Sequence, residues 1–323
     1  MPSSGHGGMD RLQKTSLIEL KQRISRARTM DVRTLTTDQV DQRIGQLMDG
    51  YHTVVIAVQL NGLYRARKNI DDKPFERVSE LWYPPAAAVR SRGRFNEIGA
   101  PVFYACNRVP GAVFEIQPKV GDLVTVLIVK TKETFVELAC AHIGLERCFA
   151  PEIGTEQRER MLQTNPRFQA MLESHGLSKK WLAVDQFFSD MATTQFPPDE
   201  AGDKYKITNA IARPLLRIPG VQALNYPSVA SNLKNINLCL TPTMADQFFT
   251  ASEAWMIRIE ETRDRLDGLD EEGPFYRTKF VRRSLSIDRD GRINWSDELH
   301  DVKPHEIAHL AYNPRAPKPT WAR

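Results

Sequence analysis

Residues 92–115 read Arg-Gly-Arg-Phe-Asn-Glu-Ile-Gly-Ala-Pro-Val-Phe-Tyr-Ala-Cys-Asn-Arg-Val-Pro-Gly-Ala-Val-Phe-Glu. This stretch joins a glycine turn to a short apolar strand over 102–105 and to a helical segment that carries Glu115. A charge beside Val113 and Phe114 is costly to bury alone, so we expect Glu115 to be paired, exposed or used in chemistry. Tyr104 and Glu115 are expected to face one cleft, with Arg65 upstream to bind an anion.

Segments of helical and extended pattern surround this stretch. Residues 10–49 predict two helices, the second with a capping box from Thr36 to Gln39 and an end at Gly50. Residues 52–67 predict an extended segment that carries Arg65 and Arg67 to opposite faces or opposite ends. Further helices are predicted within 155–218, with a break at Pro214, and the clearest strand covers 122–130, apolar enough for a central position.

The downstream part is extended again over 221–226 and 237–240, and 282–295 predicts a hairpin that turns at 288–291. Residues 255–259 fit either type of structure. Strands at both ends with helices between them favour an α+β fold. The chain shows no regular βαβ alternation and no GxGxxG or P-loop motif, which disfavours a Rossmann or P-loop site. We expect a helical extension over 1–50, a main domain over 51–265 and a packed hairpin and tail over 266–323.

Composition sets further bounds. The 323 residues are 41% hydrophobic and 26% charged, with a net charge of +4, which is ordinary for a globular protein. A dense basic run with interleaved aromatics is missing, so direct nucleic-acid binding is not expected. The four cysteines form no CxxC pair, and no apolar run reaches the length of a membrane span. These features predict a cytoplasmic protein with reduced thiols and no membrane association.

A set of short motifs resembles the RES domain, a family named for an Arg, a Glu and a Ser. The residues that carry the likeness are Leu63-Tyr64-Arg65, Arg92-Gly93-Arg94-Phe95, Gly99, Val102-Phe103-Tyr104-Ala105, Ala112, Glu115, Tyr226-Pro227-Ser228 and Asn237-Leu238. The resemblance covers roughly residues 55–260, about two-thirds of the chain. It implies a split, bent β-sandwich like that of ADP-ribosyltransferases, with inserted helices and a cleft for a nicotinamide dinucleotide.

The resemblance also implies an enzyme that destroys NAD+ by breaking the nicotinamide–ribose bond. NAD+ would be its substrate, and no prosthetic group is expected. Such proteins are best known as toxins of bacterial toxin–antitoxin pairs, so a cognate antitoxin is the expected protein partner. Homo-oligomer formation stays open. An alternative from another class is a binding module that keeps the nucleotide cleft without turnover.

Roles for single residues follow from the resemblance. Glu115 would stabilise the positive charge that develops on the ribose, as carboxylates do in glycoside hydrolysis. Arg65 would bind the pyrophosphate or a ribose, with Arg67 and Arg94 as rivals, because guanidinium groups bind phosphate oxygens in pairs. The remaining expected contacts are stacking by Tyr104, close backbone approach or a positive φ at Gly93, and hydrogen bonds from Ser228, with Ser231 as its alternative, and Asn237.

One motif competes with this interpretation. Residues 305–309 read His-Glu-Ile-Ala-His, which fits the H-E-x-x-H pattern of zinc peptidases. On a helix, His305 and His309 would share one face and could bind zinc, with Glu306 as general base. A catalytic zinc needs a third protein ligand, and the chain after His309 holds no His, Asp, Glu or Cys. We therefore expect no metal site and keep a zinc metallopeptidase as the minor alternative.

Overall fold

The structure, a computed structural model, describes residues 12, 14–145, 169–170, 173, 175–194, 196–227, 236–263 and 275–296. Its strands are β1 (Val55–Leu60), β2 (Gly62–Lys68), β3 (Phe103–Cys106), β4 (Leu123–Thr131), β5 (Val136–His142), β6 (Ala223–Pro227), β7 (Ile236–Leu240), β8 (Phe249–Arg263), β9 (Phe275–Ile287) and β10 (Ile293–Trp295). Its α-helices are α2 (Leu17–Thr29), α3 (Thr37–Met48), α4 (Val109–Glu115), α7 (His175–Thr193), α8 (Pro198–Leu216) and α9 (Pro242–Phe248). Two 3-10 turns cover Val78–Glu80 and Ala86–Ala88.

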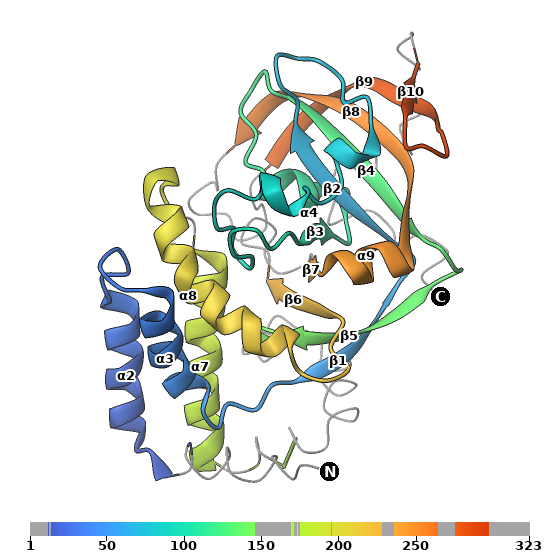
Figure 1. The fold of residues 1–323 in the computed structure, drawn as a ribbon. Coiled ribbons are helices and arrows are strands. Elements are labelled where there is room, and N and C mark those ends of the chain that lie inside the picture. The colour runs from blue at the N-terminus through green and yellow to red at the C-terminus, as the bar shows by residue number, and fades with distance from the viewer. Residues whose placement is uncertain are drawn as a thin grey trace.

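The strands form one ten-stranded mixed sheet in the order β1-β5-β6-β7-β3-β2-β4-β8-β9-β10. Neighbours pair antiparallel except for β5 and β6, which run parallel. Helices α2, α3, α7 and α8 lie together beside one half of the sheet, and α4 lies in front of β2 and β3 (Figure 1). This arrangement confirms the predicted α+β class.

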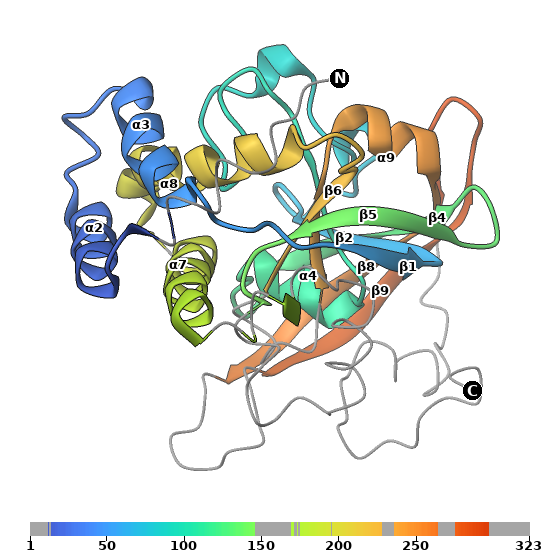
Figure 2. The same ribbon diagram turned by 90° about the horizontal axis from the view of Figure 1, so that it is seen from below.

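The middle of the sheet is its weakest junction. Strand β2 pairs with β4 along its whole length, from Gly62 opposite Lys130 to Lys68 opposite Val124. In contrast, β2 and β3 pair at one position, Tyr64 opposite Cys106. The ladder therefore nearly parts between β2 and β3, and α4 begins three residues after β3 ends. Seen from below, α2, α3 and α7 lie to one side of the strands (Figure 2).

The N-terminal helices belong to the same core as the helices that cover the sheet. Ser16 caps α2, and Thr36 forms the predicted capping box with Gln39 at the start of α3. The apolar stripe of α3, which includes Val40, Ile44 and Leu47, is buried in one cluster with Trp181 of α7 and Ile211 of α8. Burial of such stripes supplies most of the stability of helices in proteins.

Several sequence predictions are confirmed and others are wrong. The strand at 122–130 is β4, which lies in the interior of the sheet, and the hairpin turns at Asp288–Gly291 as expected. Residues 52–67 are two strands with a bend at Asn61 between them, β1 at the sheet edge and β2 at its middle. Pro214 does not break α8, since it lies in the last turn of a helix that ends at Leu216.

Among the helices that the structure describes, none combines the length and apolar character that a bilayer span requires.

Buried polar side chains around the helical core are mostly hydrogen-bonded. Tyr51 Oη donates to Asp185 Oδ1 at 2.5 Å, and the indole Nε1 of Trp181 donates to the His52 carbonyl at 2.8 Å. His142 of β5 lies beside Asn225 of β6, whose Nδ2 is 3.3 Å from both ring nitrogens.

The burial of His142 predicts acid sensitivity. Desolvation lowers its pKa from 6.5 to about 4, because the charged imidazolium is disfavoured away from water. Below pH 6.5 the unfolded chain binds a proton that the folded chain refuses, so stability falls as the pH drops from 6.5 to 4. In urea titrations at a series of pH values, His142→Gln should remove roughly 2 to 3 kcal/mol of this loss. Equal pH slopes for the variant and the natural protein would contradict the assignment.

Candidate functional site

A row of four residues crosses the centre of the sheet. Tyr64 of β2 lies opposite Cys106 of β3, Cys106 opposite Asn237 of β7, and Asn237 opposite Tyr226 of β6. Residues directly opposite each other in a ladder share a face, so these four side chains leave the same side of the sheet. Tyr104, two residues before Cys106, lies on this side as well. The row is the floor of the candidate site.

Glu115, the last residue of α4, extends its carboxylate over this row. Asn237 Nδ2 donates to Glu115 Oε1 at 2.6 Å. Asn237 is 1% exposed, whereas Glu115 is exposed, so a buried amide orients an accessible carboxylate. The other amide atom of Asn237, Oδ1, is buried without a hydrogen-bond partner. Such an acceptor is costly to leave unpaired and can accept a bond from a ligand hydroxyl or amide.

Tyr226 is a buried phenol in the floor of the site. Its phenol is 4% exposed, and burial raises its pKa well above 10, with the Glu115 charge as the next cause. The Glu115 charge raises the pKa of this phenol further, and the Arg94 charge lowers it. The sequence placed Tyr226 in a motif without giving it a role. Its position beside Pro227 and Ser228 was the signal, but only the strand register shows what it faces.

A tight turn from Gly93 to Asn96 forms one wall. The Gly93 amide donates to the Asn96 carbonyl at 3.0 Å, and a Cβ at Gly93 would lie 2.1 Å from Asn96 Oδ1. Gly93 is absent from the glycines with positive φ, so close approach of the Asn96 side chain, and not a left-handed backbone, requires glycine here.

Tyr104 fastens this turn to the sheet. Its hydroxyl accepts from the Phe95 amide at 2.7 Å and donates to Asn96 Oδ1 at 3.0 Å. Burial raises the pKa of Tyr104 well above its ordinary value of 10, so the phenol stays protonated and can donate. Phe95 in turn packs edge-on against Tyr226, with ring centroids 4.7 Å apart. Tyr104 thus acts as a positioning residue for the wall and floor.

Arg94 points away from the floor toward the helical layer. Its Nη1 donates to the carbonyls of Ala192 at 2.6 Å and Thr194 at 2.9 Å, at the end of α7. Cations at a helix C-terminus satisfy its last carbonyls and its dipole. The Arg94 guanidinium also lies over the Tyr205 ring, 5.5 Å from its centroid. These contacts give Arg94 a structural task.

Arg65 and Arg67 share one face of β2, because the pairing with β4 is regular. The expectation that they leave on opposite faces is therefore wrong. That face is the one opposite Tyr64, so Arg65 does not emerge beside Glu115. Instead Arg65 lies at the parting of β2 and β3, where its Nη1 donates to the Tyr104 carbonyl at 2.7 Å. Arg67 is exposed, lies over the Phe75 ring and donates to the Glu80 carbonyl.

The charge of Arg65 is poorly compensated. Burial, followed by repulsion from Arg67, lowers its pKa to about 10. Among the described residues no carboxylate forms an ion pair with Arg65, and its Nε is buried without a partner. A partly buried guanidinium with an unused donor favours an anion nearby. The structure therefore brings Glu115, Asn237, Tyr226 and Tyr104 together on one face, whereas Arg65 lies at the parting of β2 and β3 on the opposite face.

Other predicted residues lie outside the described part of the chain. Ser228 and its alternative Ser231 are among them, as is the His-Glu-Ile-Ala-His segment at 305–309. Within the described residues, no group of three or more His, Cys, Asp or Glu side chains could hold a metal ion. Cys106 has a pKa raised to about 12, mainly by burial, so it is not an activated nucleophile.

A comparison with known families identifies the domain. The sequence profile of the RES domain matches residues 63–263, from the start of β2 to the end of β8. The chain therefore belongs to the RES-domain family. A search of curated proteins finds no match. The family match includes the turn, α4 and the whole register row, whereas α2, α3 and β1 precede it.

The Tyr104 hydroxyl predicts a measurable loss of stability. Tyr104→Phe leaves the Phe95 amide and Asn96 Oδ1 without their partner, so we expect a loss of about 1–3 kcal/mol in the free energy of unfolding. Tyr83→Phe is the matched control, because the Tyr83 hydroxyl donates to Asp246 at 2.5 Å near the surface. Urea titration should show a clearly smaller loss for the control. Equal losses would mean that Tyr104 does not hold the turn.

Proposed function

We propose that this RES-domain protein cleaves the nicotinamide–ribose bond of NAD+. The observation that carries the proposal is the Glu115 carboxylate, exposed yet oriented at 2.6 Å by the buried Asn237, within a chain of this family. Enzymes that break N-glycosidic bonds need a fixed carboxylate near the sugar carbon at which positive charge develops. A surface Glu without a second group to orient it would lose this pre-organisation.

In the proposed reaction, the bond between ribose C1′ and the nicotinamide nitrogen breaks. Its electron pair passes to the pyridinium nitrogen, which leaves as neutral nicotinamide. The ribose then carries the positive charge, shared by C1′ and the ring oxygen, until an acceptor adds to C1′. Glu115 stabilises this charge, and Asn237 holds the carboxylate in place. The acceptor is water, phosphate or a protein nucleophile, which makes the enzyme a glycohydrolase, a phosphorylase or an ADP-ribosyltransferase.

The other groups bind and orient the dinucleotide. Arg65 attracts the pyrophosphate, since its partly buried charge has no carboxylate partner in the described structure. The buried Oδ1 of Asn237 is available for a ribose hydroxyl or the nicotinamide amide. Ser228 remains proposed as a ligand contact. Tyr104, Gly93 and Arg94 support the proposal indirectly, because they build the wall beside Tyr226.

The biological role follows from the family. We propose a cytoplasmic toxin of a toxin–antitoxin pair, with a cognate antitoxin that blocks access to Glu115. Depletion of NAD+ would arrest a cell, so a tight inhibitor is needed whenever the protein is made. The ADP-ribosyltransferase-like form of the sandwich belongs to this proposal, and the near-parting of β2 from β3 supports it.

Release of free nicotinamide tests the chemistry. Purified protein incubated with NAD+ should release nicotinamide, and Glu115→Gln should reduce the rate by at least about 100-fold, because an amide cannot stabilise the ribosyl cation. Asn237→Ala should reduce kcat by about 10-fold or more, because the carboxylate loses its orienting donor. Addition of phosphate distinguishes a phosphorylase, through ADP-ribose 1″-phosphate, from a glycohydrolase.

Glu137→Gln provides the matched control, since Glu137 is an exposed carboxylate on β5 that lies opposite Gln59 of β1 and outside the row. It should leave the rate unchanged. Tight NAD+ binding without release would instead indicate a nucleotide-binding module. Activity on peptides that a chelator and His305→Ala both abolish, with NAD+ left intact, would indicate the zinc peptidase.

A further inference from the structure

The wall of the site is held from behind by α8. The Thr208 hydroxyl donates to the Arg94 carbonyl, and Asn209 Nδ2 donates to the Gly93 carbonyl at 2.9 Å. One turn further along α8, Arg213 Nη2 donates to Glu97 Oε1 at 2.8 Å. Each of these bonds ends on the segment 93–97, which carries the Phe95 amide that Tyr104 binds. The position of the wall therefore depends on where α8 lies.

A chain of alternating charges continues from this segment into the N-terminal helices. Arg92 Nε donates to Glu97 Oε2 at 2.7 Å, and Arg92 Nη2 donates to the Thr37 hydroxyl of α3 at 3.1 Å. Arg213 lies between Glu97 and Asp41 of α3 and binds both carboxylates. The four charged side chains are only 20–30% exposed, which strengthens their interactions relative to a surface pair.

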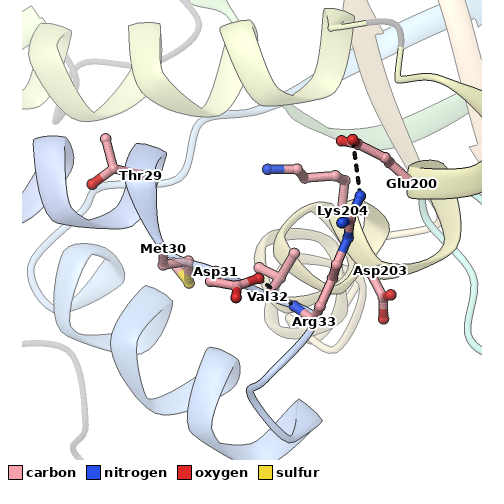
Figure 3. A pocket seen from close by; sticks show the side chains of 8 residues that line it. All are labelled: Thr29, Met30, Asp31, Val32, Arg33, Glu200, Asp203 and Lys204. Atoms are coloured by element: carbon pink, nitrogen blue, oxygen red, sulfur yellow. Dashed lines mark hydrogen bonds and ion pairs between the residues drawn. The ribbon is translucent and has the colours of Figure 1, made fainter.

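This chain of charges is distinct from the other contacts between α8 and the N-terminal hairpin, which consists of α2, α3 and the turn between them. At the opposite end of the interface, Lys206 Nζ donates to the carbonyls of Val32 at 2.8 Å and Leu35 at 3.1 Å. Arg33 pairs with Glu200 at 2.9 Å beside a hollow of about 370 Å³ (Figure 3). The residues that line this hollow do not include any of the segment 92–97. Arg33–Glu200 thus joins the turn between α2 and α3 to α8 without reaching the site.

We infer that Asp41 and Arg213 are positioning residues for the proposed NAD+ site. Asp41, on a helix that precedes the family match, fixes the Arg213 guanidinium, and Arg213 fixes Glu97 and so the wall that holds Phe95 against Tyr226. The kinetic consequence rests on the proposed function, but the positioning itself does not. The N-terminal hairpin is then a part of the site's scaffold.

The charges of these paired side chains support their role in positioning the wall. Removal of Arg213 would leave Glu97 and Asp41 as two partly buried carboxylates without their shared cation, a costly state. Asp41 depends on Arg213 for its pairing, since its other oxygen, Oδ1, is buried without a hydrogen-bond partner. The segment would relax by moving Glu97 toward water, and Phe95 and Asn96 lie directly beside Glu97 in the chain. Loss of Arg213 is thus transmitted to the Phe95 amide, and loss of Asp41 acts on it through the Arg213 guanidinium that Asp41 helps to hold.

Amide hydrogen exchange tests the positioning directly. In Arg213→Met, the Phe95 amide should exchange about 10-fold faster or more, while the amide of Val126 in the buried strand β4 keeps its rate and reports global opening. Arg213→Lys should give an intermediate exchange rate at Phe95, since an ammonium keeps the positive charge but not the fixed donor geometry of the guanidinium. Asp41→Asn tests the α3 end separately and should accelerate Phe95 by a smaller factor. Arg33→Met is the control and should change neither amide.

Unchanged exchange at Phe95 in Asp41→Asn and Arg213→Met, or exchange that rises only in step with Val126, would overturn the inference. In an NAD+ cleavage assay, the same variants should raise KM about 5- to 10-fold with kcat changed by less than about 2-fold, because Glu115 and Asn237 are untouched. A fall in kcat at constant KM would also overturn it. If the natural protein does not cleave NAD+, the exchange rates still decide the positioning, so the two proposals fail separately.

Discussion

The structure depends on the junction between β2 and β3, where two halves of one sheet meet through a single residue pair, Tyr64 and Cys106. Backbone groups that lose their ladder partners must find others. The Arg65 guanidinium binds the Tyr104 carbonyl at this junction, at 2.7 Å. This contact holds a positive charge in the middle of the sheet, where the guanidinium lies over the Phe103 ring, 5.4 Å from its centroid.

Everything else in the site is organised around that junction. Helix α4 follows β3 directly and carries Glu115 over the register row, where Asn237 binds it. The turn from Gly93 to Asn96 closes one side and is tied to the sheet through Tyr104. That turn is also hydrogen-bonded to the end of α7 and to α8, so it links the helical layer to the sheet. Displacement of α8 would reach the site through a few hydrogen bonds.

Local signals in the sequence predicted the elements that local chemistry decides. The capping box at Thr36, the apolar strand at 122–130 and the Asp-Gly turn near residue 290 all form as expected. Other elements depend on pairing over long distances. Nothing near residue 61 indicates that β1 joins the sheet edge while β2 joins its centre, and α9, which Thr241 caps, was not predicted.

The candidate site divides in the same way. The resemblance to the RES domain named Glu115, Tyr104 and Gly93 as candidate site residues, but their partners were not predictable. Asn237 lies 122 positions after Glu115, and Arg213 lies 172 positions after Asp41. Only the strand register places Asn237 under Glu115, and only the packing of α3 on α8 places Asp41 beside Arg213. Whether Arg65 and Arg67 leave the same face of the sheet depended on whether β2 pairs without a register shift.

The most direct test of the account is an experimental structure with carba-NAD, an analogue whose nicotinamide–sugar bond resists cleavage. The account predicts that the sugar carbon bonded to nicotinamide lies within about 4 Å of the Glu115 carboxylate, as charge stabilisation requires. It also predicts that the pyrophosphate lies within hydrogen-bond distance of Arg65. An analogue bound away from Glu115, with Asn237 and Glu115 still joined to each other, would contradict it.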